Sequence, residues 1–303
     1  MRKNKKFFLF ILFLFFCYVL FFLYSNIDLS KKRDFIFYEK FFFGKDSFIE
    51  YNCEIVKGAE PLFLNKSNET VVLLLHGLGG TPIEMKELGE FLGEKNFSVV
   101  IPLLPYQGRD YNSIKKLDID SVYLEVEKIY NYLKKDYNNV YVGGLSTGGS
   151  LSLKLAENHE VKGVISLSTP IFYGYKFLGD STLYFFKIMK IITPNLRRIE
   201  YGLARDKNVK KKLPSFDRLP TRVLLEGEKL RIETKNNLYK IYSPILIIQS
   251  KFDNRATPYS AEYIYKNVNS KEKKLVYLNN SGHVITMDYD KEIVFKEVSE
   301  FIK

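Results

Sequence analysis

The stretch YVGGLSTGGSLSLKLA, residues 141–156, sets one serine between paired glycines directly after a short apolar run. Its centre has the spacing G-x-S-x-G, with Ser146 in the middle. The apolar run predicts a strand, and Leu151 and Leu155 predict a helix that follows. Strand, sharp turn and helix are the context in which this spacing places a serine at a tip. Because the turn strains the serine backbone and crowds its neighbours, only glycines fit two positions away on either side.

Unbroken apolar runs recur along the chain on both sides of this stretch. They lie at residues 71–75, 98–101, 140–142, 161–167, 245–249 and 274–278. Runs without alternation are typical of strands buried on both faces, which favours a parallel sheet covered by helices. Helical patterns separate the runs and begin at Thr81-Pro82, at Asp120 or Ser121, at Thr147, near Pro258 and near Asp288. This alternation predicts an α/β fold with a mostly parallel central sheet.

The chain divides into an N-terminal segment and one folded domain. We expect residues 1–30 to form a basic cytoplasmic tail and a transmembrane anchor, and residues 31–303 to form the α/β domain. Alternating apolar positions over residues 35–57 predict entry strands. Residues 173–242 are rich in lysine, arginine and aromatic residues and have no clean run for a buried strand. They predict a mostly helical insertion that caps one end of the sheet.

The expected anchor is residues 7–24, an unbroken run of 18 aliphatic, aromatic or cysteine residues. As a helix this run is roughly 27 Å long, close to the ~30 Å hydrocarbon core of a bilayer. A cleaved signal would end in a small-x-small site, and none follows. Bulky Phe15 and Phe16 before Cys17 argue against a lipidated cysteine. Four basic residues and the amino terminus precede the run and three basic residues follow it, which places the N-terminus in the cytoplasm and the domain outside.

The net charge of +11 is concentrated in two segments. Residues 1–34 carry +5 and residues 176–240 carry +9. Nothing besides this charge supports nucleic-acid binding, so we expect no nucleic-acid partner. The basic part of the insertion is either a solvated face or a contact for anionic lipid headgroups, where each Lys or Arg contributes ~1 kcal/mol. Cys17 and Cys53 are not expected to pair, and no CxxC motif indicates a metal or redox site.

A serine hydroxyl is a weak nucleophile at neutral pH, so Ser146 needs a base and an acid that orients the base. His283 follows the last predicted strand, and Asp253 follows the strand before it. Both positions lie at the carboxyl edge, where open α/β sheets build their sites. The chain order Ser146, Asp253, His283 is the one expected for this architecture. His159 ends the helix after Ser146 and is carried away from the tip.

An attacked carbonyl also needs donors for its developing negative charge. The sequence His76-Gly77-Leu78-Gly79-Gly80 follows the first strong strand and opens into a helix. The backbone N–H of Leu78 can supply one donor, and the backbone N–H of Thr147 can supply the other. His76 is expected to brace this loop rather than to transfer protons.

Four stretches together resemble a known family: LLLHGLGGTP, GLSTGGSLSLKLA, SPILIIQSKFDNRATP and SGHVITMD. In their residues and in their order along the chain, they are similar to the bacterial carboxylesterase and monoacylglycerol lipase branch of the α/β-hydrolase superfamily. The resemblance runs from about residue 71 to residue 303 and is weakest in the insertion. It implies the α/β-hydrolase fold, Ser146 as nucleophile with Asp253 and His283 as partners, Leu78 and Thr147 as oxyanion donors, and no metal or organic cofactor. Thr147 replaces the Met or Leu often found there, which matters little because the backbone donates.

The sequence therefore predicts a membrane-anchored serine hydrolase that cleaves carboxylic esters through an acyl-serine intermediate. The family likeness and the tether favour monoacylglycerols or similar lipid esters as substrates. Two alternatives remain open at this point: a thioesterase or amidase with the same three residues, or a catalytically silent, membrane-held binding protein on a hydrolase scaffold.

Overall fold

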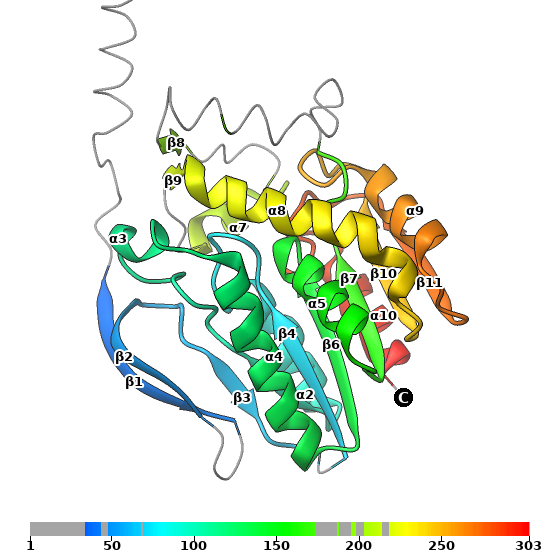
Figure 1. Ribbon diagram of the computed structural model, residues 1–303, viewed down its shortest axis with the longest axis horizontal. Coiled ribbons are helices and arrows are strands. Elements are labelled where there is room, and N and C mark those ends of the chain that lie inside the picture. The colour runs from blue at the N-terminus through cyan, green and yellow to red at the C-terminus, as the bar shows by residue number, and fades with distance from the viewer. Residues whose placement is uncertain are drawn as a thin grey trace, which may run out of the picture.

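A seven-stranded sheet forms the centre of the protein (Figure 1). The computed structural model describes residues 34–43, 48–67, 69–173, 187, 195–197, 203–213 and 218–302. The strand order is β11-β10-β7-β6-β4-β5-β3. All neighbouring strands are parallel except β3, which is antiparallel to β5 at the edge. The strands are β3 (Leu62–Leu64), β4 (Thr70–Leu75), β5 (Ser98–Ile101), β6 (Asn139–Leu145), β7 (Gly163–Leu167), β10 (Ile245–Ser250) and β11 (Lys273–Leu278). The predicted α/β fold and its six strands are confirmed; the three-residue strand β3 was not predicted.

The unbroken apolar runs arise because the central strands bury both of their faces. In β4, Val71, Leu73 and Leu75 pack into one core, and Val72 and Leu74 pack into a second core on the other face. The first core takes side chains from α4 (Ile119–Asp136), α5 (Thr147–Asn158) and α9 (Pro258–Asn267). The second takes them from α2 (Ile83–Glu94) and α10 (Lys291–Phe301). The sheet is thus a middle layer covered by helices on both faces.

Two helix starts differ from the expectation. Asp118, not Asp120 or Ser121, caps α4, because its Oδ2 accepts hydrogen bonds from the Ser121 N–H at 3.1 Å and the Ser121 hydroxyl at 2.6 Å. The helix therefore begins two or three residues earlier than a cap at Asp120 or Ser121 predicts, at buried Ile119. The last helix, α10, begins at Lys291 rather than near Asp288, which instead accepts hydrogen bonds in the preceding loop.

Strands β1 (Phe35–Phe42) and β2 (Phe48–Val56) confirm the predicted entry strands. They pair with each other as a separate antiparallel sheet and do not join the central sheet. Phe41, Tyr51 and Ile55 on the inward face of this hairpin are buried in the first core. Figure 1 shows the hairpin at the left edge of the molecule, away from β11 and α9.

The insertion is described only in part. It contains α7 (Lys207–Lys212), α8 (Thr221–Asn237), a short 3₁₀ turn η2 (Leu238–Lys240), and β8 (Asn195–Arg197) paired with β9 (Arg218–Pro220). The described part of the insertion is mostly helical, with one short strand pair, and α8 lies across α5 (Figure 1). The expected anchor, residues 7–24, lies outside the described residues. Within the described ranges, no helix has the length and apolar character needed to cross a bilayer.

Candidate active site

Ser146 lies at the junction of β6 and α5, in a backbone conformation that serine rarely adopts. Its φ is 57° and its ψ is −120°, outside the regions that suit a residue with a Cβ atom. Its N–H donates to the Leu167 carbonyl in the neighbouring strand β7 at 2.8 Å. The half-buried serine is thus held at a strained tip, as the G-x-S-x-G spacing predicts.

The two glycines flanking Ser146 are required by the close approach of backbone segments. A Cβ on Gly144 would lie 2.3 Å from the Gly148 carbonyl carbon. A Cβ on Gly148 would lie 2.2 Å from the Leu75 carbonyl oxygen of β4. Both obstacles are backbone atoms within the sheet and the elbow, which cannot move without disturbing the fold. Neither position tolerates a larger residue.

Asp253 and His283 are hydrogen-bonded to each other. Asp253 follows β10 and His283 follows β11, and the distance from Asp253 Oδ2 to His283 Nδ1 is 2.8 Å. Both residues are buried. Since β6, β7, β10 and β11 are consecutive parallel strands, this pair and Ser146 all lie at the carboxyl edge of the sheet. Residues 137 positions apart in the sequence are thereby gathered at one edge.

The Asp253 carboxylate is held by further donors. Its Oδ1 accepts the N–H of Arg255 at 2.8 Å and the N–H of Ala256 at 3.0 Å. Its Oδ2 accepts from Gln249 Nε2 at 3.0 Å in addition to His283. Because each oxygen accepts two hydrogen bonds, the carboxylate has a single orientation. It can therefore fix the proton on His283 Nδ1 and present Nε2 for chemistry.

The loop that carries His283 depends on two buried aspartates, Asp288 and Asp290, whose role in this loop the sequence did not predict. Asp290 accepts the N–H of Asn280 at 2.7 Å and the N–H of Ser281 at 2.9 Å. Burial alone would raise the pKa of Asp290, but its hydrogen bonds to Asn280 and Ser281 outweigh burial and lower it. Asp288 accepts the N–H of Gly282 at 2.7 Å. No sequence signal distinguishes these acids from solvated ones.

The insertion also supports the His283 loop. The Leu203 carbonyl accepts the N–H groups of His283 at 3.0 Å and of Val284 at 2.7 Å. Asp288 in turn accepts the N–H groups of Arg205 at 2.7 Å and Asp206 at 2.9 Å. Loop and insertion are therefore one hydrogen-bonded unit beside the candidate site.

The loop after β4 lies directly against the serine elbow. A Cβ on Gly77 would lie 3.4 Å from Ser146 Cβ. The Gly77 N–H donates to Glu84 Oε2 at 2.9 Å, and the Gly79 N–H donates to Gln107 Oε1 at 2.5 Å. These two side chains fix the backbone on both sides of the half-buried Leu78. Thr147, the second expected donor, is the first residue of α5.

His76 braces this loop, as predicted. Its Nε2 accepts the Leu104 N–H at 3.1 Å, so the ring proton resides on Nδ1 and is donated to the Gly77 carbonyl at 3.0 Å. Burial lowers the pKa of His76 from 6.5 to about 4, against the opposing effect of the Gly77 hydrogen bond. The ring is neutral at physiological pH and is fully occupied by backbone groups.

The pKa of His76 predicts a loss of stability in acid. Because the folded state resists protonation while the unfolded state protonates near pH 6.5, the free energy of unfolding falls as the pH drops from 6.5 to 4, by about 3 kcal/mol. The measurement is urea unfolding across this range for wild type, His76→Asn and His159→Asn. The loss should shrink only in His76→Asn, and an unchanged loss there would contradict the assignment.

The insertion packs on the serine side of the site. A Cβ on Gly227 of α8 would lie 2.9 Å from Leu78 Cδ2, so this glycine permits close contact with the loop. The next residue, Glu228, forms a buried pair with Arg231 through two hydrogen bonds at 2.7 and 2.8 Å. Arg231 also donates to the Ile171 carbonyl at 2.5 Å, where the chain leaves β7. This pair ties α8 to the carboxyl edge.

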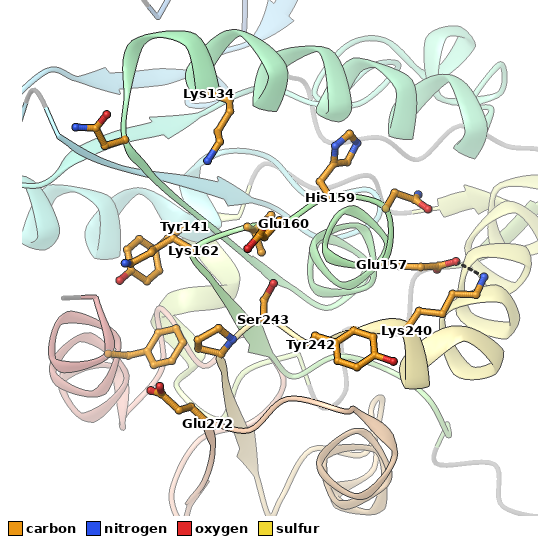
Figure 2. A pocket seen from close by; sticks show the side chains of 15 residues that line it. Lys134, Tyr141, Glu157, His159, Glu160, Lys162, Lys240, Tyr242, Ser243 and Glu272 are labelled. Carbon is orange, nitrogen blue, oxygen red and sulfur yellow. Dashed lines mark hydrogen bonds and ion pairs between the residues drawn. The ribbon is translucent and has the colours of Figure 1, made fainter.

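A cavity of about 1080 Å³ lies elsewhere, at the amino-terminal edge of the sheet (Figure 2). Its lining mixes lysines and glutamates, including an ion pair between Lys240 and Glu157 at 3.0 Å. His159 also lines it and contacts Glu127 at 2.7 Å, which confirms that this histidine is distant in the fold from the Ser146 tip. The cavity is therefore not the candidate active site. Among the described residues, no cluster of His, Cys, Asp or Glu suits a metal ion.

The fold and the elbow define the class of the protein as an α/β hydrolase. The chain matches the family model described as "Serine aminopeptidase, S33" over residues 66–290 and belongs to that family. It is 31% identical over 249 residues to a thermostable monoacylglycerol lipase of Bacillus sp. (strain H-257), covering 82% of this chain and 95% of the relative. It is 28% identical over 242 residues to a carboxylesterase of Bacillus subtilis (strain 168), covering 80% and 95%.

A solved structure from a study of the metagenome-derived lipolytic enzymes LipS and LipT is also similar. Its TM-score is 0.75 at 25% sequence identity, covering 82% of this chain and 98% of that one. The predicted family resemblance is confirmed, and the protein is a hydrolase of the lipase and esterase type.

Proposed function

We propose that this protein is a membrane-anchored serine hydrolase that cleaves carboxylic esters, with monoacylglycerols or similar single-chain lipid esters as substrates. The observation that carries the proposal is the hydrogen bond between Asp253 and His283 at the sheet edge where Ser146 forms its strained elbow. The monoacylglycerol lipase among the relatives supports the substrate class.

The proposed reaction proceeds in two halves. Ser146 Oγ attacks the ester carbonyl carbon and gives its proton to His283 Nε2, while Asp253 stabilises the imidazolium. The N–H groups of Leu78 and Thr147 donate to the oxyanion of the tetrahedral intermediate. When this intermediate collapses, His283 returns the proton to the leaving alcohol oxygen and an acyl-serine remains. Water then attacks the acyl carbon by the same sequence and releases the acid and free Ser146.

Labelling with a fluorophosphonate tests the nucleophile, because this probe forms a covalent bond only with an activated serine. We expect a single adduct, mapped to Ser146 by peptide mass spectrometry and absent in Ser146→Ala. Ser168→Ala is the matched control, since Ser168 lies at the same edge after β7 and also has a positive φ of 47°. Its labelling should equal that of wild type. A folded wild type that does not label would instead favour a silent binding protein.

Activity on a substrate panel tests the bond that is cleaved. Thioesters and amides remain alternatives because the same three residues serve all three reactions. We expect turnover of p-nitrophenyl esters and monoacylglycerols to exceed turnover of acyl-CoA compounds and peptide amides. Faster acyl-CoA or amide cleavage would reassign the substrate class while leaving the nucleophile unchanged.

We also propose that residues 7–24 anchor the protein in a membrane, with residues 1–30 comprising the tail and anchor and the domain of residues 31–303 outside the cytoplasm. The uninterrupted apolar run and the excess of basic residues before it support this arrangement. We expect residues 173–242 to act as a cap, and exposed basic residues of this segment, such as Lys207 and Lys211, to contact anionic lipid headgroups. Flotation of the full chain with lipid vesicles, resistant to high salt, tests the anchor.

A further inference from the structure

The hairpin of β1 and β2 exposes phenylalanine side chains along one face. Phe35, Phe37, Phe42 and Phe48 are 39%, 67%, 55% and 37% exposed. Water contact with large aromatic surface is unfavourable, and a cluster of such residues on one surface typically marks an interaction site. The opposite face of the same hairpin is already packed on the core through Phe41, Tyr51 and Ile55, so the exposed face is not needed for the fold. We refer to the four exposed residues as the aromatic face.

A β-bulge keeps these side chains on one side. Side chains alternate along a strand, so Phe35 and Phe37 would share a face with odd-numbered residues only. The register shifts between Tyr38 and Lys40, and after this shift Phe41 is buried and Phe42 is exposed. Phe42 lies directly opposite Phe48, with ring centroids 5.6 Å apart. The irregularity therefore extends the aromatic face along the whole hairpin.

The position of the hairpin in the chain indicates what covers it. The described structure begins at Asp34, immediately before β1. Only nine residues, 25–33, separate Asp34 from the apolar run of residues 7–24. Nine residues span at most about 30 Å when fully extended. A bilayer that holds the apolar run must therefore lie within about that distance of the start of β1.

We propose that the aromatic face rests on the bilayer surface, with its rings in the interfacial region of the lipid. This inference relies on the proposed anchor and adds a second contact that sets the orientation of the domain. Aromatic rings favour the interface between headgroups and acyl chains, where an apolar surface is removed from water. The anchor raises the effective concentration of the aromatic face at the bilayer, so a modest apolar surface is enough for binding.

The charges on the hairpin specify the kind of lipid. The exposed residues Glu39, Glu50 and Glu54 share the outward side with the aromatic face. Lys40 pairs with Glu50 at 3.6 Å and lies over the Phe48 ring at 5.0 Å. Because the charge of the hairpin that remains beside this ion pair is negative, the hairpin would repel anionic headgroups. The aromatic face therefore binds a zwitterionic lipid surface, and the basic insertion is a separate contact.

The chain contains no tryptophan, so single tryptophan variants report on one position each. We would place the full-length protein in phosphatidylcholine vesicles, with or without lipid brominated in the acyl chain. Phe37→Trp and Phe42→Trp should show blue-shifted emission and loss of fluorescence in brominated lipid. Tyr242→Trp is the matched control, because Tyr242 is 69% exposed and lines the cavity of Figure 2. It should remain solvent-exposed and unquenched.

The possible outcomes test the lipid contact separately from the proposed anchor and from the proposed hydrolase activity. If the Phe37→Trp and Phe42→Trp variants float with vesicles but their emission stays unquenched and typical of water, the lipid contact is overturned and the anchor stands. A blue shift without bromine quenching, dependent on protein concentration, would assign the face to a second copy and overturn the inference. Failure of the full chain to float would overturn both anchor and contact. Fluorophosphonate labelling of the same samples reports the hydrolase proposal independently and verifies folding.

Discussion

Replacing Asp253 by asparagine is expected to lower kcat about 10⁴-fold. Oδ2 accepts from His283 Nδ1 and Gln249 Nε2, while Oδ1 accepts two backbone N–H groups. An asparagine amide can satisfy the backbone donors with its oxygen, which turns its NH₂ group toward His283. The histidine then carries its proton on Nε2 and cannot accept one from Ser146. Binding of substrate is expected to change little, so the loss falls on kcat rather than on KM.

The measurement is steady-state hydrolysis of a soluble p-nitrophenyl ester, together with the thermal unfolding midpoint of each variant. Asp118→Asn is the matched control, because Asp118 caps α4 and asparagine caps a helix equally well. It should retain wild-type activity. A loss smaller than tenfold in a folded Asp253→Asn protein would contradict the assigned role of Asp253.

Replacing Gly148 by alanine is expected to prevent folding, or to lower the free energy of unfolding by about 4 kcal/mol or more. The new methyl group would lie 2.2 Å from the Leu75 carbonyl oxygen and 2.6 Å from the Leu75 carbonyl carbon. Leu75 ends the buried strand β4, which pairs with β6 beside it. To relieve the contact, α5 would have to move away from the sheet and expose its buried leucines.

Gly93→Ala provides the comparison for this effect. A methyl group at Gly93 would meet the end of the Leu64 side chain at 2.7 Å, which can rotate away. Alanine also favours the helix α2 over glycine by about 1 kcal/mol. This variant should remain within about 1 kcal/mol of wild type in urea unfolding. If Gly148→Ala were as stable as Gly93→Ala, the elbow would accommodate a methyl group, which would contradict the predicted clash with the Leu75 carbonyl group.

The sequence alone determined the elbow and the six parallel strands of the central sheet, because both depend on local patterns. Strands buried on two faces must be apolar at every position, so runs such as residues 71–75 and 98–101 mark them directly. The strain at Ser146 requires glycines at fixed spacing, which is also a local signal. Asp253 and His283 each follow a predicted strand, and their order in the chain was enough to identify them as candidate partners of Ser146.

Only the tertiary structure decided which polar residues support the site. A sequence does not show whether an acidic residue is buried or solvated. Only the hydrogen bonds that they accept from backbone N–H groups distinguish Asp288, Asp290 and Glu84 from solvated acids. The hydrogen bond between Asp253 and His283 likewise depends on the parallel pairing of β10 with β11. Residue spacing along one chain cannot report such contacts, since they form when separate strands pack side by side. The outward aromatic face of the hairpin follows from a register shift that is visible only once β1 and β2 are paired.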